Sequence, residues 1–171
     1  MTGSGSCAEP PLRPYHCGDL PALLALYANA VRSQCAAYYS PQQVQAWSAY
    51  AQQKEAVAAA IDRGTTLVSP VAQDDGRLAA FGVLDPGDRL ALLYCDAPWS
   101  RQGRASALLA ALSAHAQAQG VAALRTEASQ LSRPLLLRHG WQIEAEETVL
   151  FAAERFTRWR MIKTLEPCPS T

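Results

Sequence analysis

The stretch of sequence that most limits how this chain can fold runs from residue 93 to residue 109 and reads LYCDAPWSRQGRASALL. A short apolar run comes first, a polar turn follows, and Gly103 then precedes a run rich in alanine and leucine. This order predicts a strand, a tight turn and a helix. The first turn of such a helix exposes a row of backbone N–H groups, which suits a phosphate-bearing ligand.

Length, charge and cysteine content narrow the class of protein. With 171 residues, the chain is expected to form one domain with a sizeable core. The net charge is +0 and no basic block stands out, so we do not expect nucleic acid as the main partner. The five cysteines are odd in number, widely spaced and free of any C-x-x-C pair. This pattern argues against a disulfide framework and a zinc site, and favours a reduced cytoplasmic compartment.

The two ends of the sequence suggest no targeting or membrane segment. The first eleven residues have neither the basic start nor the apolar stretch of a signal peptide. No apolar run approaches the roughly 18 residues that a membrane-spanning helix needs, so no membrane partner is expected. We expect a mobile N-terminal segment over residues 1–11, a single domain over 12–165 and a loose tail over 166–171.

Apolar periodicity and turn residues predict twelve elements in the order β-α-α-α-β-β-β-α-β-α-β-β. Asp19 is the expected N-cap of the first helix, and Ser40 with Gln43 forms a capping box at the start of the second. Pro70 predicts an edge or a bulge, and Asp74-Asp75-Gly76 predicts a hairpin turn. The expected strands are 12–15, 65–73, 77–84, 90–95, 122–128, 142–151 and 156–165. The expected helices are one with apolar positions from 20 to 31, one that starts at 41 and includes 44 and 47, then 52–63 and 104–119, and a short one that starts near 132 and ends at 139. Mixed order of this kind predicts an α/β (α+β) sheet with antiparallel and parallel parts.

Three short stretches resemble the GNAT acetyltransferase superfamily. Ser100–Ala105 is similar to its motif A, Gln/Arg-x-x-Gly-x-Gly/Ala, with serine at the usual Gln/Arg position. Ala128–Trp141 resembles its motif B, and Tyr39–Trp47 resembles a stretch of the YafP-like branch. The resemblance covers about residues 12–165. It implies the GNAT fold, which is a mixed, mostly antiparallel sheet with a splayed parallel strand pair, flanked by helices.

The resemblance also implies acetyl-CoA, or coenzyme A, as co-substrate, with no metal. Backbone N–H groups of residues 101–106 would hold its pyrophosphate, with Gly103 supplying the turn and two arginines supplying charge. The pantetheine arm would lie along the strand as an added pseudo-strand, and the adenine side would lie near the last helix. The predicted cofactor-binding residues are Leu93, Cys95, Arg101, Gln102, Gly103, Arg104, Ala105, Ser106 and Arg138. The Asn that often holds pantetheine in motif B is replaced by Leu131.

The activity that the resemblance implies is transfer of an acetyl group to a primary amine of a small molecule by direct attack. The backbone N–H of Cys95 is the expected oxyanion donor. Glu127 is a candidate general base, although a glutamate at a strand end is more often solvated or salt-bridged. The motif B tyrosine that often serves as acid is Leu136 here. The strand positions where other members carry a base are Arg89 and Ala91.

Other side chains near these motifs have a functional and a structural interpretation. Tyr94 would donate a proton or pack in the core. His139 would shuttle a proton or act as a cation at a helix C-terminus, and the second role fits its position better. The Cys95 thiol would face the thioester or fill the core. Three aromatic residues are predicted to bind the acceptor, although one of them is equally well placed to be core. They are Tyr38, Tyr39 and Trp47, and the last is the ambiguous one.

Two rival functions stay open at this stage. A non-catalytic acyl-CoA-binding sensor or interaction module with the same fold would explain Leu131 and Leu136. A nucleotide-binding protein has little support, because the sequence has neither G-x-x-x-x-G-K-S/T nor G-x-G-x-x-G. The C-terminal strands would allow a homodimer, and no residue identifies the acceptor amine.

Overall fold

The computed structural model describes residues 11–53, 55–72 and 76–166. The predictions for residues 1–10, for Asp74 and Asp75 and for the tail after residue 166 lie outside this range. The helices are α1 (Leu20–Gln34), α2 (Pro41–Gln53), α3 (Glu55–Arg63), α4 (Arg104–Ala118) and α5 (Arg133–Arg138), with 3₁₀ turns η1 (Cys17–Asp19) and η2 (Ala97–Trp99). The strands are β1 (Arg13–Pro14), β2 (Thr65–Pro70), β3 (Leu78–Leu84), β4 (Leu90–Cys95), β5 (Ala123–Ala128), β6 (Gln142–Phe151) and β7 (Glu154–Thr164). Each predicted helix and strand has a counterpart in this order, which confirms the mixed α/β prediction.

The strands form two antiparallel sheets that meet at one short contact. The first sheet has the order β1-β2-β3-β4 and the second has the order β5-β7-β6. Near the start of β4, Arg89 forms a single parallel bridge with Arg125, whose N–H donates to the Asp88 carbonyl at 2.9 Å. The Thr126 hydroxyl adds a bond to the Leu90 carbonyl at 2.8 Å. Beyond this contact β4 and β5 belong to separate sheets, which confirms the predicted splayed parallel pair.

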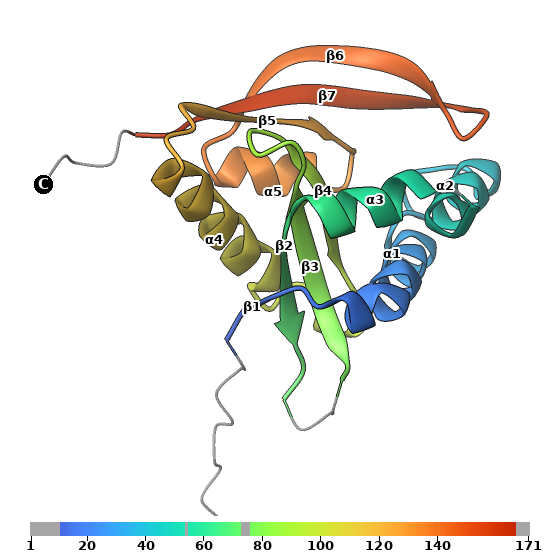
Figure 1. Ribbon diagram of the computed structural model, residues 1–171. Coiled ribbons are helices and arrows are strands. Elements are labelled where there is room, and N and C mark those ends of the chain that lie inside the picture. Colours follow the sequence, from blue (N-terminus) through green and yellow to red (C-terminus); the bar gives the residue numbers. More distant parts are fainter. Residues whose placement is uncertain (1–10, 54, 73–75, 167–171) are drawn as a thin grey trace, which may run out of the picture.

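Helices cover both faces of the first sheet. Figure 1 shows α1, α2 and α3 on one side of β2 and β3, with α4 on the other side. The β6–β7 hairpin runs over α5 at one end and reaches α2 at the other. All seven residues of β3 are buried, as expected for a strand that is covered on both faces.

Two apolar clusters hold these layers together. One packs α1, α2 and α3 against the first sheet and contains Leu23, Tyr27, Ile61 and Phe81. The other joins α4 and α5 to both sheets and contains Leu112, Leu124, Leu136 and Met161 together with Leu84 of β3. Both clusters reach β4, because Leu92 and Tyr94 pack on the first and Leu90 and Leu93 on the second. Strand β4, which leads into the loop before α4, is therefore packed on both faces.

The local sequence signals were mostly correct. The Ser40 N–H donates to Gln43 Oε1 at 2.8 Å and the Gln43 N–H donates to Ser40 Oγ at 3.2 Å, which confirms the capping box. The register shifts between Ser69 and Pro70, which confirms the bulge. The Asp19 prediction is wrong as to its side chain. That carboxylate pairs with Arg13 at 2.7 Å instead of capping α1, because η1 places it beside the N-terminal strand.

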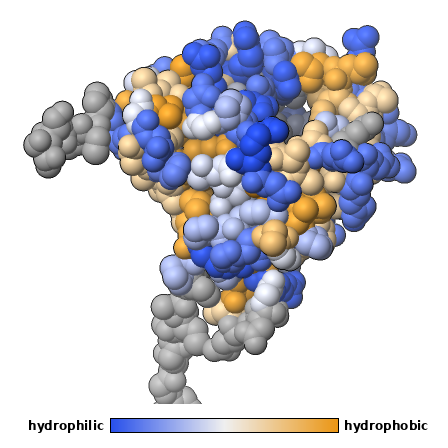
Figure 2. Space-filling view, in the orientation of Figure 1, coloured by the Kyte–Doolittle hydropathy of each residue, from blue (hydrophilic) through white to orange (hydrophobic). Residues whose placement is uncertain are grey.

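The surface of the C-terminal hairpin is largely hydrophilic. Figure 2 shows a large group of hydrophilic residues at the top of the view, over β6 and β7. The burial of β6 alternates along much of its length, as expected for a strand with one solvated face. None of the helices in the described part of the chain is both long and apolar enough to cross a bilayer.

Candidate active site

The turn before α4 has the geometry that an anion-binding loop needs. Gly103 is the N-cap residue of α4, with a φ of 81° and a ψ of 0°, in the left-handed region that favours glycine. A Cβ built on Gly103 would have no heavy atom within 4 Å, so the turn opens onto free space. The first intrahelical bond runs from the Ala107 N–H to the Gly103 carbonyl at 2.9 Å. The N–H groups of residues 104–106 therefore precede the first helical bond and point out of the helix N-terminus.

This turn forms one end of a large cleft at the splay. The cleft has a volume of about 760 Å³ and is bounded by α1, α2, β4, β5, α5 and the loop before α4. Its lining contains most of the predicted site. The predicted residues that line it are Tyr38, Trp47, Leu93, Cys95, Arg101, Gly103, Arg104, Ala105, Ser106, Glu127 and Arg138.

Two predicted side chains are turned away from the cleft. The Gln102 amide donates to the Pro98 carbonyl at 3.1 Å, so it braces the turn behind the loop. The Tyr39 hydroxyl accepts a bond from the Gln130 N–H at 2.9 Å, and burial raises the pKa of this phenol. Neither residue lines the cleft. The structure places Tyr39 outside the cleft lining, where its hydroxyl joins the segment before α2 to the turn before α5.

The Arg104 prediction is corrected in part. Its guanidinium donates to Ser69 Oγ at 2.7 Å and to the Pro70 carbonyl at 3.0 Å, and lies 5.3 Å from the ring centroid of Trp99. The side chain is buried and joins α4 to the bulge of β2, so its hydrogen bonds are directed to β2 and not to the loop before α4. What this position offers the cleft is its backbone N–H.

The free edge of β4 faces the splay. Cys95 pairs with Ala80 of β3, while the next residue, Asp96, donates its N–H to the Ala79 carbonyl at 2.8 Å. In an antiparallel pair such bonds alternate along the strand, so the N–H groups of Cys95 and Leu93 point away from β3. The Cys95 carbonyl also points into the cleft, where it accepts a bond from Gln34 Nε2 at 2.6 Å. This backbone pattern is that of an edge to which one more extended segment can add.

The side chains of this strand are structural. The Tyr94 ring packs against Tyr27 at 4.4 Å, and its hydroxyl accepts a bond from Trp47 Nε1 at 3.1 Å. Burial raises the pKa of Tyr94 well above its ordinary value, which supports the core interpretation over a proton-donor role. Burial also raises the pKa of the Cys95 thiol to about 11, so this group is a neutral packing residue at neutral pH.

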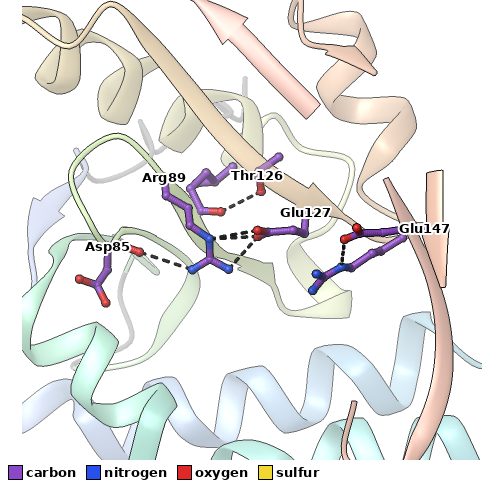
Figure 3. Close-up of polar contacts among 7 residues, drawn as sticks. Asp85, Arg89, Thr126, Glu127 and Glu147 are labelled. Carbon is purple, nitrogen blue, oxygen red and sulfur yellow. Dashed lines mark hydrogen bonds and ion pairs between the residues drawn. The ribbon is translucent and has the colours of Figure 1, made fainter. Parts of the chain in front are cut away.

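Glu127 lines the cleft as one half of an ion pair. Arg89 Nη2 lies 2.7 Å from Glu127 Oε2, and Arg89 Nε lies 3.0 Å from the same oxygen. Figure 3 shows the Arg89 guanidinium directed at the carboxylate, next to the Thr126 bond that joins β4 to β5. Because side chains alternate along a strand, Glu127 lies on the face opposite Thr126 and Ala128, and therefore toward α1 and α2. The sequence interpretation in which this glutamate is salt-bridged holds here.

The side of the cleft formed by α1, α2 and the segment between them combines aromatic and polar groups. Tyr38 is half exposed at its rim, and Trp47 lines it while packing edge-on against Phe156 with ring centroids 5.9 Å apart. Gln34 was not predicted, although it lies three residues after Val31 and continues the apolar stripe of α1. A polar residue at the end of such a stripe was the available signal.

The last helix, α5, closes the side of the cleft opposite α1 and α2. Leu136, at the position of the usual motif B tyrosine, is buried and lines the cleft with Leu131. His139 Nε2 lies 2.9 Å from Ser106 Oγ in the first turn of α4. Burial, with smaller contributions from Lys163 and Arg138, lowers the pKa of His139. His139 is at the C-cap of α5, as its predicted helix-terminal position requires, but its lowered pKa disfavours the cationic form, and the imidazole braces the loop.

A helix N-terminus that opens onto the gap between two splayed parallel strands, one with a free backbone edge, is the arrangement of an acyltransferase of the GNAT type. Residues 35–163 match the Acetyltransferase (GNAT) domain family, and the chain belongs to this family. It is an acyltransferase that carries out acetyl transfer.

Known proteins similar to the chain agree with this assignment. The uncharacterized N-acetyltransferase YafP of Escherichia coli is 28% identical over 153 residues, which is 88% of this chain and 93% of YafP. A GCN5-related N-acetyltransferase (Aminotransferase, Class-II) from Rhodopseudomonas palustris superposes with a TM-score of 0.86 at 25% identity, covering 92% of this chain and 97% of that one. The PaiA N-acetyltransferase of Thermoplasma acidophilum, solved in complex with coenzyme A, has the same fold, with a TM-score of 0.72 at 16% identity, covering 90% of this chain and 98% of that one.

Proposed function

We propose that this protein transfers the acetyl group of acetyl-CoA to a primary amine of a small molecule by direct attack of the amine. The observation that carries the proposal is that the open helix N-terminus at Gly103 and the free backbone edge at Cys95 line the same cleft. A diphosphate at one end of an extended pantetheine arm and a thioester at the other end of that arm require such a pair of sites. In the reaction an amide bond forms, the thioester C–S bond breaks, and coenzyme A leaves as the thiol.

The residues present fit acetyl-CoA. The N–H groups of residues 104–106 and the exposed Arg101 side chain would hold the pyrophosphate, with Arg138 on the adenine side. The backbone edge at Leu93 and Cys95 would bond the amides of the pantetheine arm in the manner of an added strand. Acetyl-CoA supplies the activated thioester, and the chain supplies orientation and charge.

The Cys95 N–H is the group that would bond the thioester carbonyl. It points into the splay and is held there by the ladder to β3 on one side and by the Gln34 bond on the other. A fixed donor of this kind is worth about 3 kcal/mol in the transition state. Because it is a backbone group, no side-chain substitution removes it.

Glu127 is the group that would take the proton of the amine. A primary amine with a pKa near ~10 is almost wholly protonated at neutral pH, so it must lose a proton before attack. An ammonium that enters from the α2 side would compete with Arg89 for the same carboxylate. Leu136 supplies no acid, so the thiolate would leave unassisted at that position. A thiolate with a pKa near ~8.5 can leave in this way.

A second candidate function is favoured by the same two observations. A buried leucine in place of the acid and a carboxylate already paired with Arg89 also suit a non-catalytic acyl-CoA-binding module. Both functions predict binding of acetyl-CoA, and only the enzyme predicts turnover.

Two measurements on the purified protein separate these functions. Isothermal titration with acetyl-CoA is expected to give saturable binding at one site per chain. Release of free thiol in the presence of a panel of primary amines is expected above the background with acetyl-CoA alone. Binding without thiol release would favour the sensor, and the absence of saturable binding would remove both.

A further inference from the structure

A row of charged side chains faces the acceptor side of the cleft from the second sheet. Along β7, Phe156, Arg158 and Arg160 alternate with the buried Trp159 and Met161, so they share the other face. Phe156 on that face contacts Trp47 of α2, with ring centroids 5.9 Å apart. Because Trp47 lines the cleft, this face of β7 adjoins the cleft next to Trp47, although Arg158 and Arg160 themselves lie outside its lining.

Strand register places an arginine directly beside Glu127. Glu127 of β5 pairs with Arg160 of β7, and the β-carbons of such partners lie about 5 Å apart. The partner of Arg160 on its other side is Ala145 of β6, which carries no charge. Glu147 lies farther along β6, opposite Arg158. We call the group of Arg89, Glu127, Glu147, Arg158 and Arg160 the acceptor-face charge cluster.

The acceptor-face charge cluster holds three guanidinium groups and two carboxylates. Arg89 is matched by Glu127 at 2.7 Å, and Arg158 Nε is matched by Glu147 Oε1 at 2.6 Å. Figure 3 shows Glu127 bonded to Arg89 and Glu147 bonded to an arginine of its own. The carboxylates of the cluster are therefore committed to the other two arginines.

Arg160 is the most weakly paired of the three guanidinium groups. Its Nε lies 3.7 Å from Glu147 Oε2, which is too long for a hydrogen bond, and its side chain is 56% exposed. Within residues 11–53, 55–72 and 76–166, no hydrogen bond of the Arg160 side chain is found. A planar fork of donors thus lies next to the carboxylate that would receive the amine, and its ion pair is the long contact to Glu147, a carboxylate already hydrogen-bonded to Arg158.

We infer that the acceptor is an α-amino acid, with its amine at Glu127 and its carboxylate on Arg160. This inference rests on the proposed acetyl transfer. An α-amino acid carries its ammonium and its carboxylate on the same carbon, and Glu127 and Arg160 offer the opposite charges from neighbouring positions paired in the strand register. A guanidinium binds a carboxylate through two parallel hydrogen bonds, which gives orientation as well as affinity. Tyr38 and Trp47 would contact an apolar side chain of the same acceptor.

The test compares amino acids with their decarboxylated counterparts. L-phenylalanine is paired with 2-phenylethylamine and L-leucine with 3-methylbutylamine, because each pair differs only in the carboxylate. Thiol release at saturating acetyl-CoA is expected to give a kcat/KM at least tenfold higher for the amino acid of each pair. Arg160→Gln is expected to remove this preference by raising KM for the amino acid tenfold or more, with less than a twofold change for the plain amine.

Controls separate this inference from the proposed function. Arg155→Gln removes an exposed arginine of β7 that alternation places on the other face, and is expected to change neither KM. Arg160→Lys is expected to restore part of the preference, and titration with acetyl-CoA reports whether each variant is folded. Preference for the plain amines, or an equal loss for both substrates in Arg160→Gln, overturns the amino-acid inference and leaves acetyl transfer standing. No thiol release with any acceptor overturns both.

Discussion

Arg89 and Glu127 are joined by an ion pair across the point where β4 and β5 part, with Arg89 Nη2 2.7 Å from Glu127 Oε2. This ion pair lies next to the Arg89–Arg125 bridge between the two sheets, so the candidate base is held at the point where β4 and β5 separate. A carboxylate held in this way has a defined position and a partner that an incoming ammonium can replace. The pair thus links the architecture of the cleft to the chemistry proposed for it.

The first prediction concerns this carboxylate. Glu127→Gln keeps the shape and the oxygen that accepts from Arg89, but cannot take a proton. We expect kcat to fall by about 10²- to 10⁴-fold at pH 7, the usual range for loss of a general base. The affinity for acetyl-CoA, measured by titration, is expected to change less than twofold. Glu146→Gln is the matched control, because Glu146 pairs with Trp159 on the other face of the sheet. An unchanged kcat in Glu127→Gln would assign the residue a structural role alone.

The second prediction concerns the loop. Gly103→Asp places a carboxylate where a diphosphate is proposed to bind, and we expect the affinity for acetyl-CoA to fall at least tenfold. Gly120→Asp is a close control at the other end of α4. Gly120 has a φ of 77°, against 81° for Gly103, and a Cβ on either residue meets nothing within 4 Å. The backbone strain and the added charge are therefore similar. Equal losses of affinity in both variants would mean that the loop does not bind the phosphates.

The third prediction concerns the link between the two sheets. The buried Thr126 hydroxyl donates to the Leu90 carbonyl at 2.8 Å where the strands meet. Thr126→Val keeps the volume but leaves a buried carbonyl without this donor, which typically costs about 1–3 kcal/mol. Thr126→Ser keeps the hydroxyl and is expected to lose less. Urea unfolding monitored by circular dichroism measures both free energies of unfolding, and a valine variant as stable as wild type would contradict the assignment.

The sequence predicted what depends on local pattern. The capping box of Ser40 and Gln43 and the turn at Gly103 are set by residues within four positions of each other, so their chemistry is visible in the chain itself. The side-chain partners of Arg104 and Arg89 lie 35 and 38 residues away in sequence. No local pattern indicates that Arg104 turns toward the bulge of β2 or that Arg89 reaches from β4 to β5. The loop backbone was therefore predictable, whereas the charges around it were not.

The fourth prediction concerns the pH dependence of stability through His139. Burial lowers the pKa of this imidazole in the folded protein, so the unfolded chain takes up a proton at a higher pH than the folded chain does. The stabilisation is fully present above the unfolded pKa of about 6.5 and is lost as the pH falls toward the folded value. We expect the free energy of unfolding to decrease from pH 7.5 to pH 5.5, and His139→Gln to reduce this decrease while keeping a donor for Ser106. Urea unfolding at both pH values measures the two slopes. A slope that is the same in His139→Gln and wild type would show that other groups cause the pH dependence.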